Sequence, residues 1–230
     1  MRLVNIGICG LGTVGAGVFN VLGRNSQQIN SRANCDLVIA QLGARRDNPD
    51  CNTADTNVTR DIFEVAKNPN IDIVVELIGG TDVAYELVMT ALDNGKHVVT
   101  ANKALIAQHG MEIFAAAEAR GLMVAYEAAV AGGIPIIKAL REGLSGNRIN
   151  WLAGIINGTT NFILSEMDSK GREFADVLTE AQEKGYAEAD PTFDVEGIDA
   201  AHKLVIMTSL AFGMPLSLDG IFTDGITRLE

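Results

Sequence analysis

The sequence predicts an α/β protein in which a doubly wound parallel sheet is followed by part of an α+β domain. Three observations support this prediction. Apolar runs alternate with helix-like segments over about the first 130 residues, a glycine-rich turn follows the first run, and the pattern changes after residue 131. A chain of 230 residues with 47% hydrophobic content and 24 glycines can build such a core.

Five short apolar runs are expected to form the strands of the sheet. They span residues 3–9, 36–42, 71–78, 97–100 and 122–130. The third run is rich in β-branched residues and nearly continuous, which is typical of a strand covered on both faces of a parallel sheet. Strands that alternate with helices in this way predict a doubly wound sheet.

Helices are expected between these strands. One is compatible with residues 13–22, a second begins at Thr81 or Asp82 and ends at Gly95, and a third spans 111–120. Residues 24–34 are polar, with repeated Asn, Ser and Gln, and are interpreted as a helix end followed by a loop.

The glycine-rich turn, Gly10-Leu11-Gly12-Thr13-Val14-Gly15, lies between an expected strand and an expected helix. In this setting Gly10 permits the tight turn, Gly12 lets a pyrophosphate approach the backbone, and Gly15 lets helix and strand pack closely. The N-terminus of the helix, with Thr13 and Val14, would supply N–H groups to the phosphates. The prediction is a Rossmann-type dinucleotide site; a turn whose glycines serve packing alone is the alternative.

The end of the second strand bears on the choice between NAD and NADP. An NAD site usually has an acidic residue there, whereas this chain has Arg45 and Arg46 followed by Asp47. Arginine can clamp a 2′-phosphate, so NADP is favoured and NAD is the alternative. Two solvated surface arginines are the competing interpretation, and Asp47 could weaken the preference.

Two other strand ends are expected to contact the cofactor, because open α/β sheets bind ligands at the carboxyl ends of their strands. Gly79 follows the third run, and Thr100 ends the fourth. Lys103 comes three residues after Thr100 and is well placed for a charged ligand. An ordinary exposed lysine at a helix start is the other interpretation.

A domain boundary is expected near residue 131, which divides the chain into a nucleotide-binding domain, 1–131, and an incomplete second domain, 132–230. The second domain is expected to contain a helix ending near Glu142, a strand over 149–156 and then mainly helix. Its most informative pair is Asp199 and Lys203, which share one helix face. The flanking residues are apolar, which predicts a buried functional pair, although this spacing is also common in surface pairs.

An acidic run precedes that pair. Glu188 and Asp194 lie in the turn region around Pro191, and they could bind a substrate that carries an ammonium group or form a solvated face. The spacing does not match a calcium loop. Asn157 and Thr159 follow the expected strand of this domain and form another candidate substrate-binding edge.

Composition excludes some classes of function. A net charge of −11 disfavours nucleic acid as a partner, and no apolar run is long enough to span a bilayer. The three cysteines, Cys9, Cys35 and Cys51, lack the spacing of metal ligands and fit a reducing compartment, with Cys9 in a strand core. These observations predict a soluble, cytoplasmic protein that binds a small molecule.

Six ordered segments resemble homoserine dehydrogenase and together extend over nearly the whole chain. They are Gly-Leu-Gly-Thr-Val-Gly at 10–15, Val-Val-Glu-Leu-Ile-Gly-Gly at 74–80, Thr-Ala-Asn-Lys-Ala-Leu-Ile-Ala at 100–107, Tyr-Glu-Ala-Ala-Val-Ala-Gly-Gly-Ile-Pro-Ile-Ile at 126–137, Gly-Ile-Ile-Asn-Gly-Thr-Thr-Asn-Phe-Ile-Leu at 154–164 and the acidic cluster at 185–203. The resemblance implies interconversion of L-aspartate 4-semialdehyde and L-homoserine with NAD(P)H. That reaction belongs to the biosynthesis of threonine, methionine and isoleucine.

The resemblance also implies roles for particular residues. Asp199 and Lys203 match the catalytic pair, Lys103 matches the lysine on the cofactor side, and Glu188 matches the residue that holds the substrate amino group. A nearby ammonium can stabilise or protonate the oxygen on which charge grows during hydride transfer. The expected acid is Lys203, oriented by Asp199.

A monovalent-cation site is a further implication of the resemblance. The matching positions are Glu127, Val130, Gly132 and Ile134, where sodium could be held by carbonyl oxygens; a simple interdomain hinge is the alternative. The family also implies a homodimer and a longer chain, so we expect the sequence, which stops at Glu230, to be truncated.

Two other functions stay open at the level of sequence. One is a different nicotinamide oxidoreductase of a small amino or hydroxy acid, which would keep the fold and change the substrate. The other is a non-catalytic module that only binds NADP, although such a module would have no need for Lys103, Asp199 and Lys203.

Overall fold

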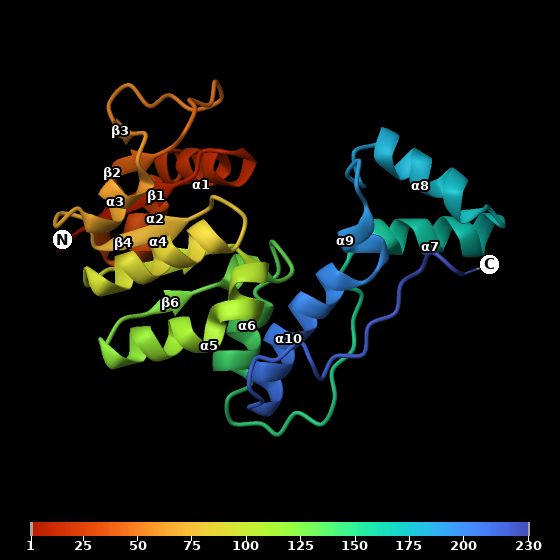
Figure 1. Cartoon of the computed structure of the whole chain (residues 1–230). Coiled ribbons are helices and arrows are strands. Elements are labelled where there is room, and N and C mark those ends of the chain that lie inside the picture. The colour runs from red at the N-terminus through yellow and green to blue at the C-terminus, as the bar shows by residue number, and fades with distance from the viewer. Residues whose placement is uncertain (1, 230) are drawn as a thin grey trace. The chain divides into compact units, whose positions relative to one another are not determined.

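A computed structural model describes residues 2–229 and divides the chain after Ala129 into two compact units. The first unit is built around a sheet, and the described residues of the second, which begins at Val130, form helices and extended chain (Figure 1). Among residues 2–229, no helix has both the length and the apolar character needed to cross a bilayer.

The sheet of the first unit is entirely parallel. Its strands are β1 (Arg2–Cys9), β2 (Cys35–Gly43), β3 (Asn57–Thr59), β4 (Ile73–Glu76), β5 (His97–Thr100) and β6 (Val124–Ala125), in the spatial order β3-β2-β1-β4-β5-β6. The chain moves outward from β1 to β3 and then returns to β4 on the other side of β1. This reversal between β1 and β4 is the position at which doubly wound sheets bind ligands.

Helices cover both faces of the sheet (Figure 1). They are α1 (Thr13–Arg24), α2 (Ser26–Ala33), α3 (Ile62–Lys67), α4 (Asp82–Asp93) and α5 (Lys103–Ala119). Because crossovers between parallel strands are right-handed, α1 and α2 lie on one face while α3, α4 and α5 lie on the other. The contacts of α4 with both α3 and α5 agree with this division.

The core beneath α1 is made by residues that alternate inward along the strands. Ile6 and Ile8 from β1 pack with Leu42 from β2 and Val75 from β4, and Phe19 from α1 covers them. Burial of apolar area at about 25 cal/mol per Å² is the main stabilising contribution of such contacts. The carboxyl ends of β1 and β4 are thereby held rigidly side by side.

The second unit is helical in its described residues. Its elements are α6 (Ile136–Lys138), which continues into the π-helical turn η2 (Ala139–Gly143), then α7 (Gly158–Lys170), α8 (Phe174–Glu183), α9 (Thr192–Val195) and α10 (Ile198–Phe212). Ile163 from α7 and Val177 and Ala181 from α8 form a buried cluster with Val195 from α9. Helix α9 thus packs against α7, and it also contacts α10.

Most of the expected elements of the first unit are confirmed, with several corrections. The strand β3 was not predicted, since its three residues are short and polar for a strand. Residues 26–33 form a helix rather than a loop, α5 begins eight residues before the predicted start at 111, and β6 covers only two residues of the run 122–130. After β6 the chain turns into the 3₁₀ helix η1 (Glu127–Ala129).

The strand expected over residues 149–156 is wrong. This segment is extended chain that forms neither helix nor strand. A strand exists only when its backbone groups pair with a neighbour, and no strand in the described part of the second unit provides one. The predicted helix ending near Glu142 is confirmed by α6 and η2.

Candidate active site

The glycine-rich turn joins β1 to α1. Gly10 has a φ of +102°, and a Cβ there would lie 2.4 Å from the backbone oxygen of Leu77. A Cβ at Gly15 would lie 2.0 Å from the Gly10 oxygen, so packing requires both glycines. A Cβ at Gly12 would meet nothing within 4 Å. The turn therefore has one position at which the backbone faces open space.

The first turn of α1 suits an anion. Its N-cap is Gly12, which has no side chain to cap the helix, and the first turn contains no acidic residue. The N–H groups and the positive dipole end at a helix N-terminus attract phosphate. Thr13 and Val14, predicted to contact the cofactor, are exposed in this turn. A pyrophosphate therefore fits the space that Gly12 leaves open.

An arginine that sequence reasoning missed lies at the end of β3. Arg60 donates to the backbone oxygen of Ala44 at 2.9 Å and to Asp47 Oδ1 at 2.8 Å. The carboxylate of Asp47, expected to weaken the preference for NADP, is thus paired with a cation. Arg45 is exposed just after β2. Arg60 could have been identified from its position directly after β3, but the sequence did not predict that strand.

A hydrogen-bond network joins the ends of β4 and β5. Thr100 Oγ1 donates to the buried carboxylate of Glu76 at 2.5 Å and accepts from the backbone N–H of Asn102 at 2.9 Å. The Asn102 side chain then donates to the Gly80 oxygen at 2.6 Å. The hydroxyl of Thr100, predicted to touch the cofactor, is therefore part of the framework that shapes this edge.

Two more of the predicted cofactor residues lie along the same edge. Gly79 has a φ of +74° in the turn after β4, a conformation that favours glycine. Lys103 is the first residue of α5 and is partly buried. Asn102 caps this helix by accepting from the Leu105 N–H at 3.0 Å. The network and the cap together fix the backbone from which Lys103 extends.

In the second unit, Asp199 and Lys203 form an ion pair in the first turns of α10. Lys203 Nζ donates to Asp199 Oδ2 and to the backbone oxygen of Ile156, both at 2.6 Å. The exposed fractions of the two side chains are 5% for Asp199 and 17% for Lys203. The lysines of two other pairs at this spacing, Lys170 and Lys184, are 60% and 48% exposed. Asp199 is buried and Lys203 is mostly buried, which agrees with the apolar flanks of the pair.

Asn157 connects this ion pair to α9. It is buried, and its Nδ2 donates to Asp199 Oδ2 at 2.8 Å and to Asp194 Oδ1 at 2.7 Å. Two carboxylates and one ammonium thus gather within one hydrogen-bonded group, which carries an excess negative charge when all three are ionised. Such a group complements a cationic ligand. The sequence predicted Asp194 and Asn157 as neighbours of a substrate, but not that one residue bridges both acids.

The two remaining predicted substrate residues differ in exposure. Thr159 is buried, and its hydroxyl donates to the Tyr186 oxygen at 2.7 Å. Glu188 is exposed, and its backbone oxygen accepts from Gln182 Nε2 at 3.1 Å. The carboxylate of Glu188 is therefore available at the surface, while Thr159 helps to hold the turn after α8.

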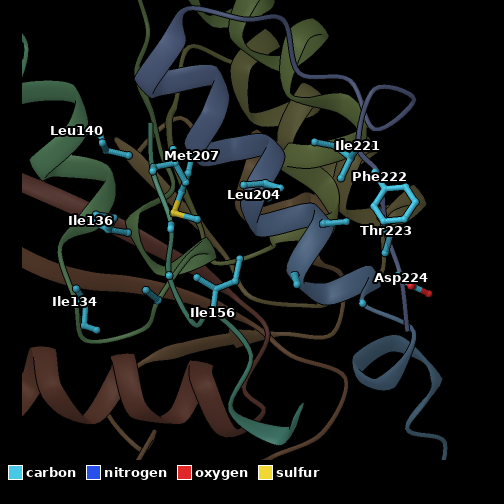
Figure 2. Close-up of a pocket in the computed structure, with 17 residues that line it drawn as sticks. Ile134, Ile136, Leu140, Ile156, Leu204, Met207, Ile221, Phe222, Thr223 and Asp224 are labelled. Carbon is cyan, nitrogen blue, oxygen red and sulfur yellow. The ribbon is translucent and has the colours of Figure 1, made fainter. Parts of the chain in front are cut away.

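Helix α10 has a second, apolar side. A cavity of about 540 Å³ lies next to it. Leu204 and Met207 project into this cavity from the helix, and Ile136 and Ile156 project from the preceding chain (Figure 2). Neither Asp199 nor Lys203 lines this cavity. The polar pair and the apolar cavity therefore use different faces of one helix.

The expected cation ligands fall in the segment where the two units join. Glu127 lies in η1 of the first unit, whereas Val130, Gly132 and Ile134 belong to the second. Ala131 and Gly133 have φ values of +52° and +83°. No group of three or more His, Cys, Asp or Glu side chains suited to a metal occurs among residues 2–229. A site of backbone oxygens at this bend stays a prediction.

Comparison with known families covers almost all of the chain. A family model described as the NAD binding domain of homoserine dehydrogenase matches residues 10–127, and a second model, homoserine dehydrogenase, matches residues 135–230. The chain belongs to the homoserine dehydrogenase family. Its first unit is accordingly a Rossmann-type NAD-binding domain, as the glycine-rich turn predicted.

Individual relatives agree with this assignment. The chain is 68% identical over 229 residues to homoserine dehydrogenase from Pseudomonas aeruginosa and 54% identical over 233 residues to that from Neisseria gonorrhoeae. These alignments cover 100% of this chain and 53% of each relative, so the chain spans about half the length of the curated relatives it matches.

Solved structures show the same fold. A homoserine dehydrogenase from Thiobacillus denitrificans superposes with a TM-score of 0.93 at 58% identity, covering 100% of this chain and 53% of that one. A putative homoserine dehydrogenase from Archaeoglobus fulgidus gives 0.85 at 33% identity, covering 98% of this chain and 73% of that one. The family includes NAD(P)-dependent oxidoreductases of amino-acid biosynthesis, which fits the two sites described above.

Proposed function

We propose that this chain carries the cofactor-binding and catalytic residues of a homoserine dehydrogenase, which interconverts L-aspartate 4-semialdehyde and L-homoserine with a nicotinamide cofactor. The reaction would serve the biosynthesis of threonine, methionine and isoleucine. The buried Asp199–Lys203 ion pair is the observation that carries the proposal. Buried charges are rare unless they are paired or functional, and this pair belongs to a chain with an open phosphate-binding turn.

Lys203 is the proposed proton donor. A lysine ammonium has three N–H groups, and two of them are used by Asp199 and the Ile156 oxygen. The third can donate to the oxygen of the substrate, where negative charge grows as hydride reaches the aldehyde carbon. In the reverse direction, Lys203 takes the hydroxyl proton. When bound, the nicotinamide exchanges the hydride, while Lys103 contributes positive charge beside cofactor and substrate.

The acidic groups would bind the other end of the substrate. Both L-homoserine and L-aspartate 4-semialdehyde carry an ammonium group. This group can donate hydrogen bonds to the carboxylates of Asp194 and Glu188. Thr159 supports the neighbouring turn through its bond to the Tyr186 oxygen. A site with two carboxylates and one lysine would disfavour 2-oxo acids that lack an amino group.

NADP is the proposed cofactor, with NAD as the weaker ligand. Arg45 and Arg60 stand at the ends of two adjacent strands, and the pairing of Asp47 with Arg60 removes a charge that would repel a 2′-phosphate. A hyperthermophilic archaeal homoserine dehydrogenase in complex with NADPH has a TM-score of 0.84 to this chain at 27% identity. That neighbour supports the same cofactor class here.

The proposal extends to assembly, compartment and a cation. We infer a homodimer from membership of the family. We also infer a cytoplasmic location, because Cys9, Cys35 and Cys51 are all free thiols, as in a reducing compartment. Sodium would be held by Glu127 and the backbone oxygens of Val130, Gly132 and Ile134, since hard cations prefer oxygen ligands.

The test measures oxidation of NADPH with L-aspartate 4-semialdehyde, with pyruvate and 2-oxoglutarate as control substrates. We expect turnover with the semialdehyde alone. Because the chain spans about half of its relatives, the assay is repeated on a fusion to the remaining half of the Pseudomonas aeruginosa relative. Binding of NADPH by both forms without turnover would instead favour a non-catalytic module.

Replacing Lys203 by methionine tests the assigned acid. We expect turnover to fall by about 10² to 10⁴-fold while the Kd for NADPH stays within a few-fold, since only proton transfer is lost. Lys170→Met is the matched control, because Lys170 pairs with Glu166 at the same spacing on an exposed surface. Turnover close to wild type in Lys203→Met would refute the assignment.

A further inference from the structure

The amide group of Asn157 is completely committed to hydrogen bonds inside the protein. Its Oδ1 accepts from the Thr160 N–H at 2.8 Å, which makes Asn157 the N-cap of α7. Its Nδ2 donates at 2.7 and 2.8 Å to Asp194 and Asp199. The residue is 7% exposed. Its contacts therefore bind it to the protein rather than to a ligand.

The chemistry of the partners fixes the orientation of this amide. The Thr160 N–H can only donate, so the side-chain atom facing it must be the oxygen. Ionised carboxylates can only accept, so the atom facing Asp194 and Asp199 must be the nitrogen. Both requirements are met at once. A flipped amide would place the acceptor against two acids and lose the helix cap.

Residues 156 and 157 hold both members of the ion pair. The backbone oxygen of Ile156 accepts from Lys203 Nζ, and the side chain of Asn157 donates to the same Asp199 oxygen that Lys203 contacts. Two consecutive residues before α7 therefore contact an ammonium and a carboxylate that lie one helical turn apart on α10. This arrangement fixes the direction of the ammonium better than the ion pair could alone.

We propose that Asn157 is the positioning residue of the Asp199–Lys203 pair: its N–H groups hold Asp199 against Lys203 and tie Asp194 to the same amide. The assignment rests on the proposed function for its catalytic meaning, and it replaces the direct contact with substrate that the sequence predicted. The charged groups around the amide are Asp194 from α9 and Asp199 and Lys203 from α10, while the ring of His202 of α10 meets that of Phe193 edge to face.

Two substitutions separate donation from helix capping. Asn157→Ser keeps an oxygen that can cap α7 but replaces the two N–H donors to the acids by a single O–H on a shorter side chain. Asn157→Asp keeps the shape and the cap but adds a third carboxylate. Asp61→Ser is the control, because Asp61 caps α3 in the other unit by accepting from the Phe63 N–H at 2.9 Å. All three variants should keep thermal unfolding midpoints within a few degrees of wild type.

The first measurement does not depend on activity. In the wild-type chain, the ammonium protons of Lys203 should give a slowly exchanging ¹H–¹⁵N signal, since two of its donors are held at 2.6 Å. We expect this signal to broaden beyond detection in Asn157→Ser and to persist in Asp61→Ser. Persistence of the signal in a folded Asn157→Ser protein would overturn the proposal, whether or not the chain turns over substrate.

The second measurement is kinetic. In Asn157→Ser, kcat should fall by about 100-fold with the substrate KM changed only a few-fold, because small misplacements of a reacting group have that effect. In Asn157→Asp, kcat should recover as the pH is lowered, since a protonated carboxyl can donate again. Adding Asn157→Ser to Lys203→Met should change kcat little further. A raised substrate KM with unchanged kcat would instead identify a substrate ligand and overturn the proposal.

Discussion

At the scale of single residues, partners decide what a charged side chain can do. Lys170, Lys184 and Lys203 each stand four residues after an acid, yet only Lys203 is mostly buried and also bonded to a backbone oxygen. An exposed pair at this spacing contributes about 0.3–0.5 kcal/mol and constrains little. The spacing was visible in the sequence. The Ile156 oxygen and the Asn157 amide, 42 or more residues away, were not.

A residue-scale prediction concerns Arg60 and the cofactor. Arg60→Gln should weaken NADPH binding more than NADH binding, because it removes one positive charge and releases the Asp47 carboxylate toward the 2′-phosphate. The measurement is the Kd of each cofactor by fluorescence titration. Arg24→Gln is the control, since Arg24 lies in the last turn of α1, far from its N-terminus. An equal loss of affinity for NADPH and NADH would show that Arg60 does not contribute to recognition of the 2′-phosphate.

At the scale of elements, local patterns succeeded where a segment carries its own signal. The strand β5 and the start of α4 follow the predicted limits because apolar spacing and flanking glycines mark them. The strand β3 is three residues long and has meaning only through its pairing with β2. Residues 149–156 have the composition of a strand, but no partner strand lies in the described part of their unit. Strand propensity can be read from a short stretch of sequence, but strand pairing depends on a partner strand elsewhere in the chain.

The glycines of the turn between β1 and α1 allow a prediction at this scale. Gly12→Ala should leave the thermal unfolding midpoint near wild type, since the added Cβ meets nothing within 4 Å, but it should weaken NADPH binding because the methyl group enters the space for the pyrophosphate. Gly10→Ala should instead destabilise the fold, because φ is +102° and the Cβ would strike the Leu77 oxygen.

Calorimetry and cofactor titration on both variants distinguish the two effects. Gly17→Ala serves as the control, because this glycine lies inside α1 and its Cβ would also meet nothing within 4 Å. Unchanged NADPH affinity in a folded Gly12→Ala protein would show that the open space at Gly12 is not where the pyrophosphate lies.

At the scale of the whole molecule, the chain separates two tasks between two units. The first unit holds a parallel sheet with the glycine-rich turn at its switch point, and the second holds the acid–lysine pair among helices. All three cysteines lie in the first unit, and the single tryptophan, Trp151, lies in the second. Thiol and tryptophan signals can therefore follow the two units separately.

Cys9 makes the stability of the first unit depend on pH. Burial, and to a lesser extent the nearby Glu76 carboxylate, raises the pKa of this thiol from 9.0 to about 12. The folded state therefore keeps the thiol neutral, whereas the unfolded chain ionises above pH 9. The stabilisation is fully present below pH 9 and is lost as the pH rises toward 12.

The expected result is a fall in the unfolding midpoint of the first unit as the pH rises from 9 toward 12. Thiol accessibility is the measurement. Cys9→Ala should reduce that fall, since alanine has no ionisable group, and Cys35→Ala is the comparison variant at a thiol that is only partly buried. A pH dependence that is identical in wild type and Cys9→Ala would contradict the assignment of this effect to Cys9.

The sequence by itself determined the family, the order of most strands and helices, and the identity of the charged residues, because each of these depends on local spacing or on short motifs. Tertiary structure alone decided that Arg60 pairs with Asp47 and that Asn157 joins Asp194, Asp199 and, through its neighbour Ile156, Lys203. These contacts link residues 13 to 47 positions apart. Only the packing of separate elements brings such groups within hydrogen-bond distance, since a hydrogen bond requires about 3 Å between atoms that the chain alone leaves unconstrained.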